Sequence, residues 1–170
     1  MKTLFLLRHA SAEPSDGDDH ARILTRRGRD EAARAATCLA ALEPQPALAL
    51  CSPAQRALET LDAMLARLPD LDVTRDPELY LASAGEILDR VQALPETLDT
   101  ALVVAHNPGL AALARSFPRA GGEAGEAPLV TFPPAALAVV ACKTDAWADL
   151  VPGRGRLLRV CRPVVDMEPG

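Results

Sequence analysis

Short apolar runs alternate along the chain with longer segments in which apolar residues recur every three or four positions. The runs Thr3–Leu7, Ala47–Cys51 and Ala101–Ala105 have the length and composition of strands buried on both faces of a sheet. A periodic segment predicts a helix that starts at Thr25, a natural N-cap, and ends before Pro44 and Pro46. Its expected apolar stripe consists of Ala32, Ala33, Ala36, Leu39, Ala40 and Leu42.

Further elements follow in the same alternation. We expect a helix from Ser52–Pro53 to about Leu68, a short strand at Asp72–Thr74, a helix near Ala84–Leu94, a helix capped by Asn107 that runs from Pro108 to about Phe117, and an antiparallel pair of strands at Ala135–Cys142 and Gly155–Arg162. This order predicts an α/β fold, a three-layer sandwich in which a mostly parallel sheet carries helices on both faces and has an antiparallel edge. We expect residues 1–170 to form a single domain, because the sequence shows no internal repeat and no linker.

Composition narrows the class of protein. Hydrophobic residues make up 49% of the chain and charged residues 24%, as in an ordinary globular domain. The net charge of −5, without a basic stripe, argues against a nucleic-acid partner. No apolar stretch reaches transmembrane length and no signal-peptide pattern opens the sequence, so we expect a cytoplasmic protein with no membrane contact.

The cysteines and the polar loops add little chemistry. The four cysteines, Cys38, Cys51, Cys142 and Cys161, are widely spaced and are expected to be buried free thiols in a reducing compartment. The segment Ser11–Arg22 contains Asp16, Asp18 and Asp19 without calcium-loop spacing, so it predicts a solvated loop in which His20 lies at the surface. We expect Gly121–Pro128 to be a flexible loop at the rim of a site, and Pro163–Gly170 to be a loosely packed tail.

Polar side chains follow three of the predicted strands at the point where each strand ends. Arg8 and His9 follow the first, Arg56 lies in the first turn of the helix after the second, and His106 follows the strand Ala101–Ala105. A solvated arginine and a chance histidine would explain any one of these positions alone. Together they converge on the crevice beyond the carboxyl ends of the strands, where α/β proteins bind ligands.

These residue types predict phosphoryl transfer. Two arginines can hold phosphoryl oxygens and neutralise the charge that grows in the transition state. They also disfavour an imidazolium nearby, which keeps His9 neutral and nucleophilic. Because arginine takes the place of magnesium, we expect neither a metal nor a cofactor.

Three segments resemble the signature motifs of the histidine phosphatase superfamily, the phosphoglycerate mutase-like fold. They are LLRHASAE from Leu6, SPAQRALET from Ser52 and VAHNPG from Val104. The resemblance implies that His9 is phosphorylated during the cycle and that Arg8, Arg56 and His106 form the phosphate pocket. We expect Asn107, beside His106, to bind the substrate.

Within this superfamily the chain is most similar to the small SixA-type phosphohistidine phosphatases. The short chain, the sequence RHA and the pattern D-x-x-R-x-L-T-x-x-G over Asp19–Gly28 carry this likeness. In that pattern Arg22 matches an arginine near the bound phosphate, which implies that it binds the substrate.

The chain departs from the ester-cleaving members of the superfamily at Leu79. Those enzymes carry a general-acid glutamate shortly after this leucine, whereas here Tyr80 to Ser83 contain no acid and Glu78 precedes the leucine. A leaving alkoxide benefits from a proton donor, but a phosphorylated imidazole can already carry a proton on its ring. We therefore expect a phosphatase that acts on phosphohistidine in a partner protein.

Three alternatives remain open at this stage. The first is a small phosphomonoesterase of broad specificity, and the second is a module that recognises phosphate without turnover, although recognition alone needs no nucleophile. The third is a metal-binding protein that uses His9, His20 and His106. It ranks last because the arginines beside these histidines would repel a cation.

Overall fold

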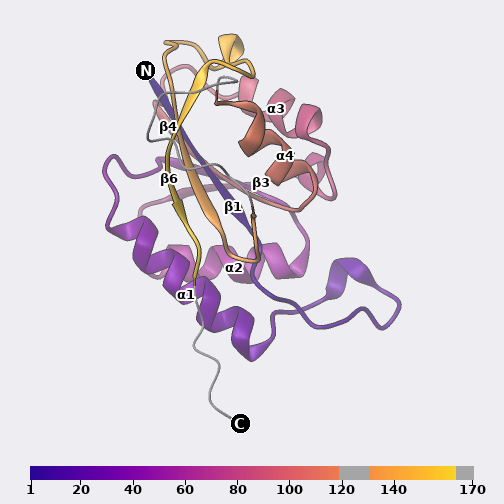
Figure 1. Cartoon of the computed structure of the whole chain (residues 1–170). Coiled ribbons are helices and arrows are strands. Elements are labelled where there is room, and N and C mark those ends of the chain that lie inside the picture. The colour runs from indigo at the N-terminus through magenta and orange to yellow at the C-terminus, as the bar shows by residue number, and fades with distance from the viewer. Residues whose placement is uncertain (119–130, 164–170) are drawn as a thin grey trace.

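The apolar runs of the sequence lie side by side as strands of one mixed sheet. In the computed structural model, which describes residues 1–118 and 131–163, the strand order is β3-β2-β4-β1-β5-β6 (Figure 1). The strands are β1 Lys2–Arg8, β2 Leu48–Cys51, β3 Asp72–Arg75, β4 Thr100–Ala105, β5 Leu137–Cys142 and β6 Gly155–Cys161. The pairs β1–β4, β2–β4 and β2–β3 are parallel, while β1–β5 and β5–β6 are antiparallel. The predicted parallel sheet with an antiparallel edge is confirmed.

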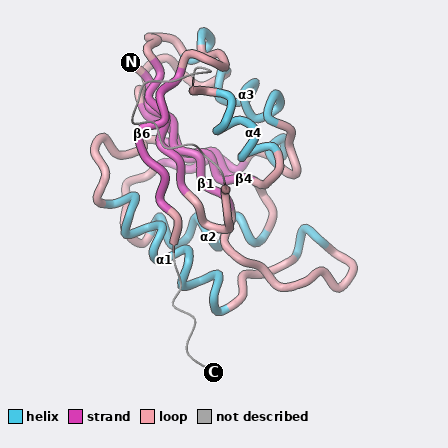
Figure 2. The backbone as a smooth tube through the Cα atoms, viewed as in Figure 1, coloured by secondary structure: helices cyan, strands magenta, loops and turns pink. Residues whose placement is uncertain are grey.

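Helices cover both faces of this sheet (Figures 1 and 2). The helices α1 (Arg26–Ala40) and α2 (Gln55–Leu65) pack on one face, and α3 (Ala84–Gln92) and α4 (Gly109–Ser116) pack on the other. Short 3-10 turns lie at η1 Asp19–Ala21, η2 Pro77–Leu79 and η3 Trp147–Asp149. The chain therefore has the expected three-layer architecture.

The central strand β1 supplies side chains to two separate hydrophobic cores. Leu4 and Leu6 face the layer of α3 and α4, whereas Phe5 and Leu7 face the layer of α1 and α2. All four side chains are buried. Successive side chains of a strand point to opposite faces, so an apolar run without alternation is what a strand between two helical layers requires.

The first helix begins as its sequence indicates. The Thr25 side chain accepts a hydrogen bond from the backbone N–H of Gly28, as an N-cap does. The predicted stripe is correct for Ala32, Ala36 and Leu39 but wrong for Ala33, which is exposed. Its buried face instead includes Glu31, whose role is described with the site.

Two helix starts differ from the expectation. Helix α2 begins at Gln55, with Ala54 as its N-cap residue, and not at Ser52–Pro53. The Ser52 side chain is buried at the strand end, where it contacts His106 and does not cap the helix. Helix α4 begins at Gly109, and Asn107 caps it from two residues away by accepting a hydrogen bond from Ala111 N–H.

The prediction of four free thiols is wrong for two cysteines. Cys51 and Cys142 are buried free thiols, but Cys38 and Cys161 form a disulfide that joins α1 to the end of β6. These two residues are separated by 123 positions in the chain, so only the packing of α1 beside the sheet edge brings them together. The cysteines therefore do not support the argument for a reducing compartment.

Two further expectations lie outside the residues that the structure describes. They are the rim loop Gly121–Pro128 and the tail after Pro163. Among the described helices, none has the length and the apolar character needed to cross a membrane.

Helix α4 approaches the segment after η2 so closely that only glycine fits at its first position. A Cβ on Gly109 would lie 1.9 Å from the Ala82 carbonyl oxygen. We expect Gly109→Ala to destabilise the fold by about 1–3 kcal/mol, because backbone must shift to admit the methyl group. A Cβ on Gly85 in α3 would meet nothing within 4 Å, so Gly85→Ala is the matched control and should be neutral or stabilising by up to ~1 kcal/mol. Urea unfolding measures both, and equal stability of the two variants would contradict the close approach.

Candidate active site

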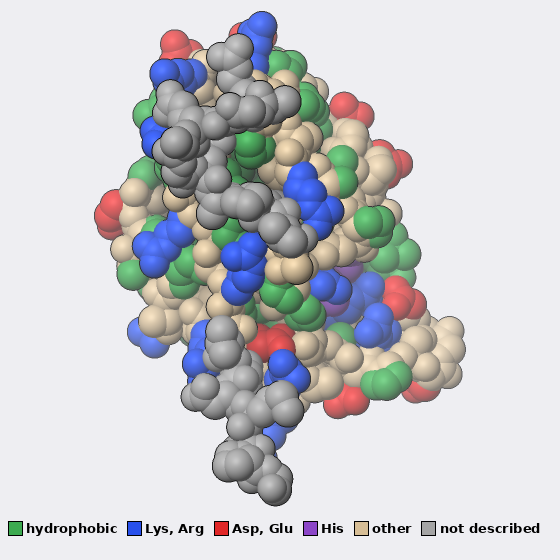
Figure 3. Space-filling model, in the orientation of Figure 1, with side chains coloured by type: hydrophobic (Ala, Val, Ile, Leu, Met, Phe, Trp, Pro, Cys, Tyr) green, Lys and Arg blue, Asp and Glu red, His purple; other side chains and the backbone are tan. Residues whose placement is uncertain are grey.

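The carboxyl ends of the neighbouring strands β1, β4 and β2 bring the predicted residues together at one edge of the sheet. The ring centroids of His9 and His106 lie 5.2 Å apart, and the Arg56 Nε atom is 3.4 Å from His9 Nε2. His9, Arg56 and His106 are all buried, and Arg8 is partly buried beside them. In Figure 3 a small patch of histidine surface is visible among Lys and Arg side chains. The predicted convergence is confirmed.

Hydrogen bonds fix the tautomer and the direction of His9. Its Nδ1 atom lies 2.8 Å from the Ala10 carbonyl oxygen, which can only accept, so the ring proton is assigned to Nδ1. The Nε2 atom therefore keeps its lone pair and faces Arg56. This is the orientation that a nucleophilic imidazole needs.

Residues of α1 and α2 hold the backbone around His9. The Ala10 N–H donates to Thr60 Oγ1, and the Thr60 hydroxyl donates to the Arg56 carbonyl oxygen. At the next residue, the Ser11 N–H and hydroxyl both donate to the buried Glu31 carboxylate. Neither Thr60 nor Glu31 stood out in the sequence, because their partners lie 50 and 20 positions away in the chain.

Burial and the neighbouring cations keep both histidines neutral. Desolvation, followed by the charges of Arg56, Arg8 and Arg22, lowers the pKa of His9 from 6.5 to about 4. Desolvation, with His9 and Arg56, lowers the pKa of His106 to about 3. At neutral pH the site therefore contains two uncharged imidazoles beside arginines.

Two buried polar atoms at this edge have no hydrogen-bond partner within the described residues. They are Arg8 Nε and His106 Nδ1. The Nε2 atom of His106 lies 2.7 Å from Ser52 Oγ, which also accepts from Ala54 N–H. With the Ser52 hydroxyl donating to Nε2, Nδ1 carries the proton and becomes a donor. Buried donors without a partner are costly, and an oxyanion in front of His9 would satisfy them.

The other end of Arg8 is tied to the backbone. Arg8 Nη1 donates to the Phe132 carbonyl oxygen at 3.2 Å, and Asn107 Nδ2 donates to the same oxygen at 2.9 Å. Asn107 thus lies beside the site, with both atoms of its amide bonded inside the protein. Its role in binding substrate stays a prediction.

Four side chains form a rim around this buried floor: the half-buried Asp19, Arg22 and Tyr80, and His20, which is exposed as expected. The expectation of a solvated loop is right for Asp16 and Asp18, which are exposed, but wrong for Asp19. Asp19 binds Arg56 through its carboxylate and its carbonyl oxygen, and its carboxylate also binds Arg22 and Tyr80. The spacing of Asp19 and Arg22, three positions apart, was the only signal of this in the sequence.

Tyr80 directly follows Leu79, in the stretch Tyr80–Ser83 that contains no acid. Its ring lies edge-on to His106 at 5.7 Å and 4.8 Å from the ring of the exposed His20. Glu78 is exposed, and its charge acts on Arg90. The structure thus places a phenol, not a carboxylic acid, next to His106.

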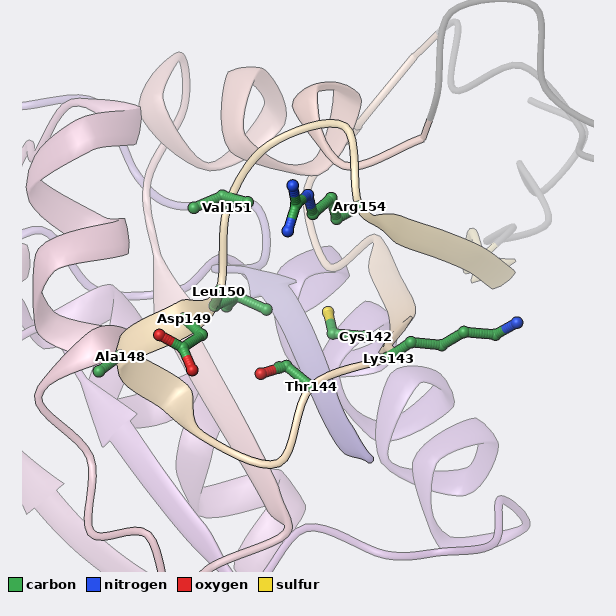
Figure 4. A pocket seen from close by; sticks show the side chains of 8 residues that line it. All are labelled: Cys142, Lys143, Thr144, Ala148, Asp149, Leu150, Val151 and Arg154. Carbon is green, nitrogen blue, oxygen red and sulfur yellow. The ribbon is translucent and has the colours of Figure 1, made fainter.

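No metal site accompanies these groups in the described part of the chain. Residues 1–118 and 131–163 contain no set of three His, Cys, Asp or Glu side chains that could hold a metal ion. A cavity of about 480 Å³ lies elsewhere, lined by Cys142, Lys143, Thr144, Ala148, Asp149, Leu150, Val151 and Arg154 (Figure 4). Cys142 pairs with Lys2 at the amino end of β1, so this cavity is at the opposite end of the sheet from His9.

Comparison with known proteins agrees with this geometry. The profile of the histidine phosphatase superfamily (branch 1) matches residues 4–90. An uncharacterized protein of Mycobacterium tuberculosis H37Rv is 34% identical over 156 residues, which cover 89% of this chain and 96% of the relative.

Two solved structures share the fold and part of the sequence. The first is a candidate phosphohistidine phosphatase SixA from Nakamurella multipartitia, 32% identical with a TM-score of 0.82, covering 96% of this chain and 97% of that chain. The second is the protein histidine phosphatase SixA in complex with tungstate, 27% identical with a TM-score of 0.72, covering 94% and 96%.

The burial of His9 predicts an unusual titration. Its folded pKa of about 4 lies below the ordinary 6.5, so the ring stays neutral while an unfolded chain takes up a proton. We expect ¹⁵N NMR of the ring nitrogens to show no protonation of His9 between pH 7 and about 5. The free energy of unfolding should fall as the pH drops from 6.5 towards 4. A His20→Asn variant assigns the signals, and titration of His9 near 6.5 would show that the ring is not desolvated.

Proposed function

The chain belongs to the histidine phosphatase superfamily, and we propose that it is a phosphohistidine phosphatase that acts on a phosphorylated histidine of another protein. The superfamily match and the SixA-like structures support a phosphatase, a hydrolase. In our proposal its active site is the buried floor of Arg8, His9, Arg56 and His106. The reaction on a protein substrate is our inference from the chemistry of that site.

In the proposed first step, His9 Nε2 attacks the phosphorus of the substrate. The bond between phosphorus and the substrate's ring nitrogen breaks, and its electron pair stays on that nitrogen. Arg56 already points its Nε–H towards His9 Nε2, so it lies beside the path of the transferring group. Arg8 Nε and His106 Nδ1 supply further donors to the phosphoryl oxygens.

In the second step, water attacks the phosphorus of phospho-His9. The bond to Nε2 breaks, its electron pair returns to the imidazole, and the proton that water loses passes to the phosphate product. The Nδ1–H of His9 remains bonded to the Ala10 carbonyl oxygen throughout, so the ring regains its starting tautomer. No metal is required for either step, because the arginines carry the positive charge.

One observation carries the choice of substrate: within residues 1–118 and 131–163, no carboxylic acid is placed at the site to protonate a leaving group. Its rim carboxylate, Asp19, is held ionised, because the Tyr80 hydroxyl, Arg22 and Arg56 keep the pKa of Asp19 well below its usual range. Glu78 is exposed, and the neighbouring Arg90 is ion-paired with Asp76. A leaving imidazole that already bears a proton needs no such acid, whereas an alkoxide does.

The related structures support a pocket that binds a phosphoryl group. The SixA structure that shares 27% of its sequence with this chain holds tungstate, an oxyanion comparable in charge to phosphate. The orientation of the His9 lone pair also favours catalysis over recognition without turnover, because binding alone does not require a nucleophile.

We expect a covalent phospho-His9 intermediate. Brief incubation with ³²P-labelled substrate and rapid quenching should leave label on the protein that is stable in alkali and lost in acid. His9→Ala should remove both the label and the turnover, because the variant lacks the ring nitrogen that we propose as the nucleophile. His20→Ala is the matched control at the rim and should keep the label. Substantial turnover by His9→Ala would exclude the mechanism.

The lack of an acid predicts a steep dependence of ester hydrolysis on the leaving group. A phosphohistidine peptide should be the best substrate, p-nitrophenyl phosphate should follow, and an alkyl phosphate should be slower than the aryl ester by at least about 10²-fold, the lower range of general-acid catalysis. Values of kcat/KM for the three substrates, measured side by side, provide the test.

The Glu78→Gln variant distinguishes a phosphohistidine phosphatase from a phosphomonoesterase of broad specificity. For a phosphohistidine phosphatase its kcat/KM on all three substrates should stay within about twofold of the wild type, because the side chain is exposed and outside the site. Rapid cleavage of alkyl phosphate that is lost in Glu78→Gln would instead establish a phosphomonoesterase of broad specificity.

A further inference from the structure

The Asp19 carboxylate is the centre of a hydrogen-bond network at the rim of the active site. Its Oδ1 atom accepts from Arg22 Nη1 at 3.1 Å, and its Oδ2 atom accepts from Arg56 Nη2 at 3.1 Å and from the Tyr80 hydroxyl at 2.5 Å. Its backbone carbonyl oxygen also accepts from Arg56 Nη1 at 2.7 Å. The three partners come from α2, from the chain after η1 and from the chain after η2, so tertiary structure fixes this one carboxylate from three directions.

The leaving group of the substrate lies next to the rim residues when the phosphoryl group occupies the floor. The nucleophile and the phosphate-binding groups form a floor in which His9 is 8% exposed and His106 and Arg56 are 2% exposed. The Asp19 side chain, by contrast, is 40% exposed. A phosphoryl group that reaches His9 Nε2 from solvent therefore occupies the floor, and in-line transfer leaves the departing ring on the solvent side, at the level of Asp19.

At this level Asp19 offers an acceptor. A carboxylate has about four lone-pair sites, and the contacts above use three of them, which leaves one on Oδ1. The Tyr80 hydroxyl already directs its proton to Oδ2 and does not donate to the leaving group. The unused lone pair on Asp19 Oδ1 can therefore accept a hydrogen bond from an N–H group.

We propose that Asp19 is a specificity-determining residue, whose carboxylate accepts the N–H of the substrate's phosphorylated imidazole. The group that donates is the ring nitrogen that does not carry phosphorus. This inference rests on the proposed function and names the residue that distinguishes phosphohistidine from phosphate esters.

The proton balance explains the advantage. The protonated ring binds with its N–H directed to Asp19, and the bond between phosphorus and the other nitrogen breaks with its electron pair on that nitrogen. The product is a neutral imidazole that keeps the proton it brought from solvent, so the enzyme transfers no proton to the leaving group. An ionised carboxylate favours the charged ring over the neutral one, which is a poorer leaving group.

The same carboxylate disfavours esters. An ester leaving group has no N–H to donate, and the negative charge that develops on its oxygen is repelled by Asp19. The charged and titratable groups that face Asp19 are Arg56, Arg22, Tyr80, His106 and His20. The two arginines keep it ionised, so it does not become a proton donor in the pH range of the reaction.

The test compares Asp19→Asn with wild type on a phosphohistidine peptide and on p-nitrophenyl phosphate. We expect kcat/KM on the peptide to fall about 10- to 100-fold, the usual effect of losing a hydrogen bond to a charged group. On the ester kcat/KM should not fall and should rise slightly, because the repulsion of the leaving oxygen is removed. Asp16→Asn removes the same charge from an exposed position of the same loop and should leave both values unchanged. Asp19→Glu, which keeps a carboxylate, should recover part of the preference.

The pH profile provides a readout that a structural role would not move. Without the carboxylate the bound ring loses its proton more readily, so the alkaline limb of kcat for the peptide, which reports ionisation in the bound state, should shift to lower pH in Asp19→Asn. The profile for p-nitrophenyl phosphate should not shift. Tungstate affinity within about threefold of wild type would show that the phosphate pocket of the variant is intact.

Two results would overturn the proposal. If Asp19→Asn lowers kcat/KM equally on both substrates and leaves the pH profiles in place, Asp19 only positions Arg56. If the variant keeps the wild-type preference for the peptide, Asp19 has no part in specificity although the proposed function stands. A wild type that itself shows no preference for phosphohistidine would instead refute the proposed function.

Discussion

The hydrogen bond between His9 Nδ1 and the Ala10 carbonyl oxygen is the constraint on which the chemistry of this protein depends. It fixes the proton on one ring nitrogen and leaves the lone pair of the other directed into the site. A free imidazole would exchange between tautomers and rotate. Here the carbonyl oxygen belongs to a residue whose own N–H is bonded to Thr60, so helix α2 indirectly sets the direction of the nucleophile.

Both helical layers contribute to the site, each through a different kind of contact. The layer of α1 and α2 supplies Arg56, Thr60 and the buried Glu31, which holds the loop after His9. The opposite layer supplies Asn107 and, through the close packing of α4 on the segment after η2, the position of Tyr80. Since the strand ends lie between these layers, the buried floor forms at the meeting point of two hydrophobic cores.

The site combines a strongly cationic floor with an anionic rim. Arg8 and Arg56 suit a phosphoryl dianion, and the same charges, together with burial, keep the histidines neutral. Asp19 adds one negative charge at the rim, where we propose that the leaving group departs. In the proposed mechanism this division of charge suits a substrate that carries its own proton, because the enzyme need only bind that proton and does not have to supply one.

The sequence by itself determined the sheet, its two helical layers and the convergence of Arg8, His9, Arg56 and His106. These features depend on local signals: apolar runs, caps and the rule that parallel strands end at one edge. Only the tertiary structure decided the roles of Asp19, Tyr80 and Ser52, and the pairing of Cys38 with Cys161. Asp19 meets Arg56 and Tyr80 across 37 and 61 positions, and Ser52 meets His106 across 54. Contacts at such separations arise from the packing of whole elements, which no local pattern of residues encodes.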